Sequence, residues 1–87
     1  MRSPTYDLTI STARADALFA SPLQRSDEPT PAQVHQAIAA AVAAFGIRGC
    51  AARVAQAFGE HPETAVTRIR WVRTMVARAV PAACLAA

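Results

Sequence analysis

The sequence contains no lysine and few glycines, cysteines or aromatic residues. All nine basic residues are arginine, and the 87 positions include 3 glycines and 2 cysteines. So few glycines, none of them clustered, exclude a glycine-rich loop of the kind that binds phosphate groups. Cys50 and Cys84 are too few and too far apart for a disulfide framework or a zinc motif. These absences exclude several common classes of enzyme and of secreted protein.

Catalytic and metal-binding groups are also scarce. His35, His61, Cys50 and Cys84 show no spacing typical of metal ligands, so no metal ion and no cofactor is expected. There is no supported pairing of Ser or Cys with His, and no pair of carboxylates on one helical face. We therefore expect a protein that is not an enzyme, with Cys50 as a small core residue.

Long apolar runs are missing as well. The first ten residues, "MRSPTYDLTI", lack the apolar run of a signal peptide. The segment "AIAAAVAAFGI" is apolar, but it is short for a membrane span and consists mostly of alanine. The sequence therefore predicts a cytoplasmic protein with reduced thiols and no membrane segment.

Alanine is what the chain has in abundance, with 22 of the 87 positions. Alanine buries little apolar surface, so the hydrophobic fraction of 53% overstates the size of the core. A chain this short is only marginally stable alone, and association with a second chain would compensate. We therefore expect a homodimer.

Charge is distributed unevenly along the chain. Residues 1–30 carry a net charge of −1, whereas residues 31–87 carry +4. The basic part is also the part with the clearest helical pattern. This asymmetry indicates nucleic acid or an acidic protein surface as a partner.

The pattern of breakers and apolar residues predicts an all-α fold, a small domain of four helices. Residues 1–30 are expected to form an N-terminal arm, loose to about residue 11, with a short helix at 11–20 and a Pro-rich linker. Residues 31–87 are expected to form the helical domain. Its first helix starts after Thr30, which forms a capping box with Gln33. Gly46 is expected to end that helix in the left-handed conformation, before the short turn "GIRGC".

The last two predicted helices face each other across a second glycine. The segment "CAARVAQAF" is a compact helix that Gly59 ends, and Phe45 and Phe58 are expected to pack beneath the two glycine turns. The last helix runs from Pro62 to about Val80, where a proline follows. Its apolar stripe consists of Ala65, Ile69, Val72, Val76 and Ala79.

Residues 51–73 resemble the helix-turn-helix of sigma-factor region four and of LuxR-type DNA-binding domains. The resemblance is carried by small Ala55, by Phe58-Gly59, by Thr64-Ala65 and by Arg68-Ile69, followed by "RWVR". Two residues depart from that pattern: Glu60 stands where the families have an apolar residue, and Ala65 where they have valine.

The resemblance implies a small DNA-binding protein of the helix-turn-helix type that regulates transcription. The start of the last helix would approach the major groove of DNA. Contacts to bases and phosphates would then involve Glu63, Thr64, Thr67, Arg68, Arg70 and Arg73, with Arg48 or Arg53 on the preceding helix against the backbone. Independently of the resemblance, Glu63, Thr67, Arg70 and Thr74 lie opposite the apolar stripe on a helical wheel.

A second hypothesis is a helical protein-interaction module that does not bind DNA, either a homodimeric adaptor or a regulator bound to the transcription machinery. Trp71 lies at the border of the outward face, with Met75 one turn later. Tryptophan is enriched at interface centres. Trp71 and Met75, with Leu85 beyond them, are the predicted interface residues. The two hypotheses differ in what the exposed face of the last helix contacts.

Overall fold

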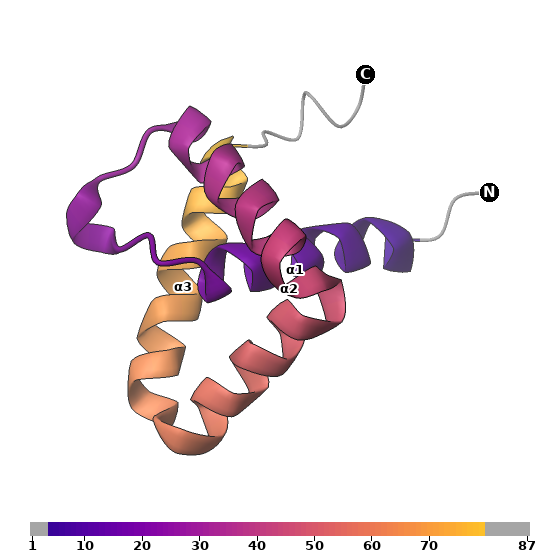
Figure 1. Cartoon of the computed structure of the whole chain (residues 1–87), viewed down its shortest axis with the longest axis vertical. Helices are drawn as coiled ribbons and strands as arrows, with labels where there is room; N and C mark the ends of the chain where they lie inside the picture. The colour runs from indigo at the N-terminus through magenta and orange to yellow at the C-terminus, as the bar shows by residue number, and fades with distance from the viewer. Residues whose placement is uncertain (1–3, 80–87) are drawn as a thin grey trace.

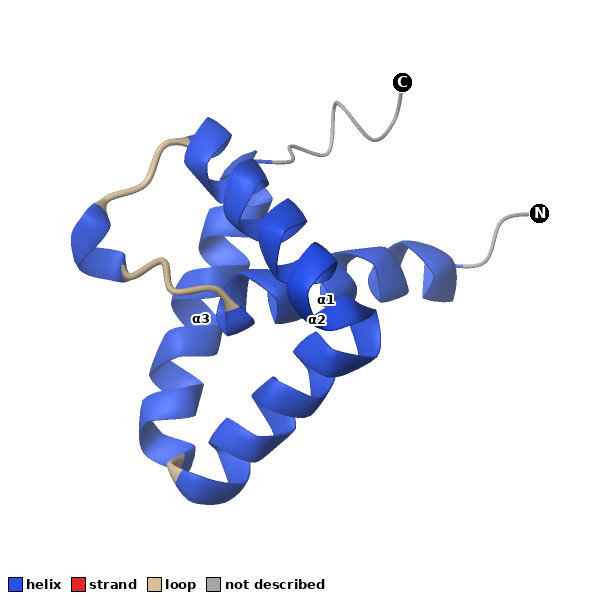
Figure 2. Cartoon of the chain, viewed as in Figure 1, coloured by secondary structure: helices blue, strands red, loops and turns tan. Residues whose placement is uncertain are grey.

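The chain folds into three helices joined by one long and one very short connection (Figures 1 and 2). The structure, a computed structural model, describes the backbone of residues 4–79 and the side chains of residues 10–79. The helices are α1 (Pro4–Ala20), α2 (Pro31–Glu60) and α3 (Pro62–Ala79), and η1 (Arg25–Asp27) is a single 3₁₀ turn. The described residues contain no strand, so the all-α prediction is confirmed. Leu85 and Cys84 lie outside the described residues.

Helix α1 is longer than predicted, because it begins at Pro4 and not at Ser11. Proline is well suited to the first helical position, where its missing N–H costs no hydrogen bond. No other proline and no glycine occurs before Ala20, so nothing interrupts the helix. Residues 4–11, predicted to be a loose arm, are thus helical.

The connection at 21–30 is a loop, as predicted. The hydroxyl of Ser21 donates to the carbonyl of Leu18 at 2.6 Å, which closes the end of α1. The loop ends at Thr30, whose hydroxyl accepts from the N–H of Gln33 at 3.2 Å. The Gln33 side chain accepts from the N–H of Thr30 at 2.8 Å, and this confirms the predicted capping box.

Gly46 bends α2 but does not end it. Its backbone angles, φ 72° and ψ 167°, are non-helical, and the helix resumes directly after it. The predicted positive φ and the break at Gly46 are confirmed, since two helical segments meet there at a kink. The ψ of Gly46 is not that of a left-handed helix end, and the predicted turn "GIRGC" is wrong because the chain is helical again from Ile47. These angles lie in a region that is essentially limited to glycine. Two of the four predicted helices are therefore one kinked helix.

Gly59 does not form the turn between α2 and α3. Helix α2 continues through Glu60, and His61 is the single non-helical residue before Pro62. Among the described residues, only Glu28 and Gly46 have a positive φ. The predicted glycine turn at Gly59 is therefore wrong. The N–H of His61 instead donates to the carbonyl of Ala57 at 2.8 Å, which closes α2 through its own backbone.

The core lies where α1 crosses the open side of the α2–α3 hairpin (Figure 1). Its centre contains the fully buried Leu18, Val34 and Val72. The predicted stripe on α3 is confirmed, since these residues are all buried or, at its last position, half-buried: Ala65, Ile69, Val72, Val76 and Ala79.

A second, smaller cluster joins α1 to the middle of α2. It consists of Ala17, Ala41 and Cys50, and Cys50 is fully buried as predicted. The predicted burial of Phe45 and Phe58 is wrong, because they are 37% and 36% exposed. Phe58 still stacks on the buried ring of Phe19, with the ring centres 6.4 Å apart, whereas Phe45 lies against the guanidinium of Arg53.

Helix α2 is long and apolar enough, by length and composition alone, to cross a membrane. The sequence analysis had set aside the segment "AIAAAVAAFGI" of this helix as too short and too rich in alanine for a membrane span. In the structure much of α2 lies on the surface, and large parts of it are exposed. The apolar character of α2 therefore needs an explanation other than the small core.

Candidate functional site

The candidate site is the outward face of α3. Six of the seven predicted DNA-contacting residues are exposed, namely Arg53, Glu63, Thr64, Thr67, Arg70 and Arg73. Two hydroxyls on this face are bonded within the helix. Thr67 donates to the carbonyl of Glu63 at 3.2 Å, and Thr74 donates to that of Arg70 at 3.1 Å. The arginine side chains are therefore the main free hydrogen-bond donors of this face.

Arg68 is the exception, since it points inward and binds the end of α1. Its guanidinium donates to the carbonyl of Phe19 at 2.9 Å, to that of Ser21 at 2.9 Å and to that of Leu23 at 3.0 Å. The last carbonyls of a helix have no partner within the helix and attract a positive charge. Arg68 is half-buried, and its Nε and one of its Nη atoms donate to these carbonyls, so it does not stand on the outward face with the other predicted residues.

Arg68 also lies against two aromatic rings. Its guanidinium carbon is 5.3 Å from the centre of the Phe19 ring and 5.6 Å from that of Trp71. Burial lowers the pKa of Arg68, because the charged form loses water. Trp71 is thereby connected, through one arginine, to the end of α1 and to the loop that follows it.

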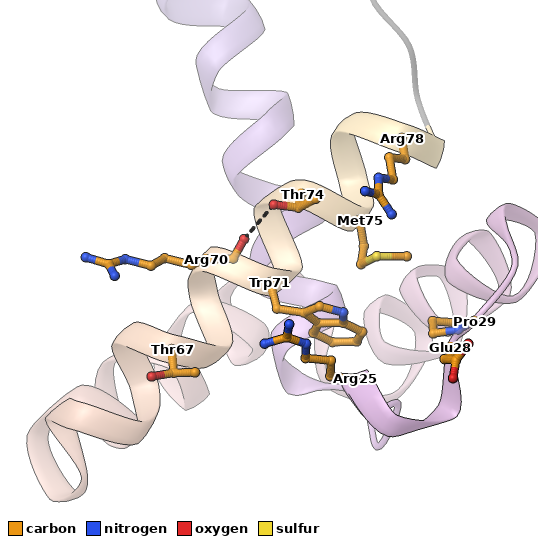
Figure 3. Close-up of a pocket in the computed structure, with 9 residues that line it drawn as sticks. All are labelled: Arg25, Glu28, Pro29, Thr67, Arg70, Trp71, Thr74, Met75 and Arg78. Atoms are coloured by element: carbon orange, nitrogen blue, oxygen red, sulfur yellow. Dashed lines mark hydrogen bonds between the residues drawn. The ribbon is translucent and has the colours of Figure 1, made fainter.

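A groove separates the outward face of α3 from the loop that precedes α2 (Figure 3). Its volume is about 700 Å³. Trp71 and Met75 are half-buried and contribute the large apolar surface. The remaining lining residues are polar, charged or proline: Arg25, Glu28, Pro29, Thr67, Arg70, Thr74 and Arg78.

Charge in this groove is predominantly positive. Arg25, Arg70 and Arg78 line it together with one carboxylate, Glu28. In Figure 3, Arg25 extends from the loop toward Trp71, and Arg78 lies near Met75 at the end of α3. The groove thus combines an apolar centre with a basic border. Such an arrangement suits a ligand that has both apolar and acidic groups.

The other predicted residues do not gather at this groove. Arg53 lies on α2 with its guanidinium 3.8 Å from the centre of the Phe45 ring. Glu63 and Thr64 line a separate hollow beside His61. The charge of Arg73 acts on Asp16 of α1, where burial raises the pKa of the carboxyl and Arg73 partly opposes this effect. The predicted DNA-contacting set is therefore divided among several surfaces.

The titratable side chains of the described residues are scattered and do not cluster as metal ligands would. No three His, Cys, Asp or Glu side chains come together among them. Nε2 of His35 lies 3.0 Å from the carbonyl oxygen of Ala79, which connects the start of α2 to the end of α3. The thiol of Cys50 donates to the carbonyl of Ala41 at 3.6 Å, and burial raises its pKa. Both side chains thus bind backbone carbonyls and help to hold the helices in place.

Sequence reasoning missed the loop side of the groove. Arg78 continues the spacing of Arg70 and Thr74 on α3, so the helical wheel contained a signal for it. Arg25, Glu28 and Pro29 come from the predicted linker, and only the fold brings them opposite α3. No local pattern could have identified them.

Comparison of the chain with protein families, with curated proteins and with solved structures gave no match.

Proposed function

We propose that this chain is a helical protein-interaction module that binds an acidic segment of another protein in the groove beside Trp71. The observation that carries this proposal is the half-buried pair Trp71 and Met75 with Arg25 and Arg78 beside it, while Arg70 lies at the outer edge with its guanidinium pointing away from Trp71 (Figure 3). Tryptophan, methionine and arginine are the residues enriched at protein interfaces. The occupant would place an apolar side chain on Trp71 and carboxylates on the arginines.

The apolar contact would supply most of the affinity. A buried aromatic anchor contributes about 2 kcal/mol or more at an interface. Exposed ion pairs contribute only about 0.2–1 kcal/mol each. Arginine binds a carboxylate through two parallel N–H donors, so Arg25 and Arg78 would select an acidic ligand and fix its orientation.

The test uses Trp71 as a reporter, because it is the sole tryptophan of the chain. Short synthetic peptides that alternate Glu with Leu are titrated while Trp71 fluorescence is recorded. Matched peptides carry Gln in place of Glu. We expect a saturable spectral change with the acidic peptides, at about micromolar affinity, and a much weaker one with the Gln peptides.

Variants locate the binding site. Arg25→Ala and Arg78→Ala should each weaken binding of the acidic peptide severalfold. Arg48→Ala is the matched control, since Arg48 is exposed and does not line the groove. Equal binding of the Gln peptides, or equal weakening by Arg48→Ala, would overturn the proposal.

DNA binding is the second candidate, and the exposure of Arg70 and Arg73 on α3 favours it. Two features make it the weaker one. Glu63 lies on the first turn of α3, where it would repel phosphates. The major groove is about 12 Å wide and admits one helix, whereas the Arg25–Pro29 loop stands beside the second half of α3.

Substitution of single arginines distinguishes peptide binding from DNA binding. Arg73 does not line the groove, and Arg25 does. A DNA-binding protein should shift mixed-sequence duplex DNA in a gel, with steep salt dependence, and lose the shift in the Arg70→Ala plus Arg73→Ala double variant. A peptide-binding module should depend on Arg25 and tolerate Arg73→Ala. Absence of any shift at low salt would exclude DNA binding.

A further inference from the structure

Glu28 lines the groove beside Trp71 and has an unusual backbone conformation. Its φ and ψ are 46° and 58°, and among the described residues it is the only one other than glycine with a positive φ. Glycine and asparagine reach this left-handed region readily, whereas the Cβ atom of a glutamate disfavours it. Pro29 follows, and a residue before proline favours an extended backbone. The backbone therefore does not explain why a glutamate stands at this position.

The loop holds Glu28 in this conformation through its own hydrogen bonds. The N–H of Glu28 donates to the carbonyl of Arg25 at 3.1 Å, and the N–H of Gln24 donates to Oδ2 of Asp27 at 2.8 Å. Pro29 is buried, whereas Glu28 itself is exposed. Sparsely populated backbone conformations persist only where the surroundings enforce them, and they concentrate at functional sites. Glu28 thus belongs to a wall of the groove that is formed before any ligand binds.

The charge of Glu28 is opposite to that of the arginines in the groove. Among the described residues that line it, Glu28 is the only carboxylate, and Arg25 and Arg78 stand beside Trp71 and Met75 (Figure 3). A carboxylate in this place repels the acidic groups that the arginines attract, and it attracts a basic group. A ligand with acidic groups alone is therefore not the best complement of the groove, whereas a ligand with charges of both signs matches it.

We propose that Glu28 is a specificity-determining residue of this groove, and that it selects a peptide segment with one basic side chain among its acidic ones. This inference rests on the proposed function, because it concerns the same groove and the same kind of partner. The basic side chain of the segment would bind Glu28, while its carboxylates bind Arg25 and Arg78. Such a residue gives specificity twice, by attracting the matching segment and by repelling segments that are acidic throughout.

Peptides with a single altered charge test this proposal on the full chain. In the alternating Glu-Leu peptide, each Glu in turn is replaced by Lys, and the Kd is measured through Trp71 fluorescence. At one position, Lys should tighten binding to the wild type by about two- to fivefold, the range of one exposed ion pair. At the other positions, Lys should weaken binding, because it removes a carboxylate that an arginine would bind.

Glu28→Asn shows whether Glu28 causes this preference. Asparagine removes the charge and suits the left-handed backbone, so the variant should melt no lower than the wild type. The favoured Lys peptide should lose its advantage in Glu28→Asn, and the all-Glu peptide should bind this variant more tightly than the wild type. Asp27→Asn is the matched control, because Asp27 is exposed in the same loop and does not line the groove. It should keep the wild-type preference.

The possible outcomes distinguish this inference from the proposed function. If the all-Glu peptide binds but no Lys peptide binds more tightly, the role of Glu28 is refuted and the acidic-peptide site stands. The same holds if Glu28→Asn keeps the preference for the Lys peptide, or if Asp27→Asn abolishes it equally. If neither the all-Glu peptide nor any Lys peptide binds, the proposed function itself fails, and this inference with it.

Discussion

At the scale of single residues, Arg68 explains most about how the candidate site is built. It joins α3 to three carbonyls at the end of α1 and in the following loop. It also lies near the rings of Phe19 and Trp71. The loop that carries Arg25 and the helix that carries Trp71 therefore keep their relative positions through one side chain. Arg68 thus holds in place both walls of the groove between α3 and the Arg25–Pro29 loop.

Arg68→Met should destabilise the fold, because the buried carbonyls at the end of α1 lose their donor while the apolar stem is largely kept. An unsatisfied buried polar group costs about 1–3 kcal/mol. Urea unfolding followed by Trp71 fluorescence measures the loss. Arg70→Met, on the same helix but exposed, is the control and should change stability by less than about 0.5 kcal/mol. Similar effects of both variants would contradict the role assigned to Arg68.

Asp16 gives a pH-dependent prediction. Burial raises its pKa above the ordinary value of 3.8, against the smaller opposing effect of Arg73. The folded state therefore binds the proton more tightly than the unfolded state, so this contribution to stability is present below 3.8 and is lost as pH rises through the raised pKa. Asp16→Asn should raise the melting temperature at neutral pH.

The advantage of Asp16→Asn should shrink as the pH is lowered, since the wild-type carboxyl becomes neutral too. Thermal unfolding at neutral pH and below the ordinary aspartate pKa would show this difference. Asp27→Asn is a suitable control, because Asp27 is exposed in the loop. A constant advantage of Asp16→Asn at both pH values would show that charge burial is not its cause.

At the scale of helices, the two glycines of α2 that were predicted to end helices behave differently. Gly46 has φ 72°, whereas Gly59 lies within the helix and has no positive φ. A Cβ atom would meet nothing within 4 Å at either position. Any difference between alanine substitutions at these sites therefore comes from the backbone alone.

Gly46→Ala should cost about 1–3 kcal/mol, because alanine would be held in a region of backbone angles that only glycine tolerates. Gly59→Ala should stabilise the fold by about 0.5–1 kcal/mol, since alanine is the better helix former. Urea unfolding of the two variants measures both changes. A stabilising Gly46→Ala would mean that α2 is straight in solution.

Local signals explain which parts of the helices could be predicted. The capping box of Thr30 and Gln33 and the apolar stripe of α3 were confirmed, because their partners lie within a turn or two of each other. The break at Gly46 was predicted, but the turn "GIRGC" after it was wrong, because one non-helical residue is enough to bend a helix that resumes at once. The role of Arg68 was missed, because its acceptor in Phe19 is 49 residues away.

At the scale of the whole molecule, the three helices share one core. Leu18 and Phe19 of α1, Val34 of α2 and Val72 of α3 belong to the same buried cluster. The sequence suggested an arm at 1–30 and a helical domain at 31–87. In the folded chain, α1 fills the opening between α2 and α3 (Figure 1). Helix α1 is therefore part of the same folding unit as α2 and α3.

A fragment of residues 31–87 should not fold by itself. Removing α1 exposes Val34 and Val72, and it takes away the carbonyls of Phe19 and Ser21 that bind Arg68. Burial of one large apolar side chain contributes about 1.5–3 kcal/mol, and a domain of this size is only marginally stable. The loss of Leu18 and Phe19 alone is therefore enough to unfold the remainder.

Circular dichroism and Trp71 fluorescence of the fragment measure this directly. We expect low helicity, a solvent-exposed tryptophan and no cooperative transition in urea, whereas the full chain should unfold in one transition seen equally by both methods. Adding a synthetic peptide of residues 1–30 should restore helicity and shift the Trp71 emission, since Arg68 would regain its acceptors. A fragment that unfolds cooperatively without the peptide would show that α2 and α3 form a domain of their own, and that α1 only covers one of its faces.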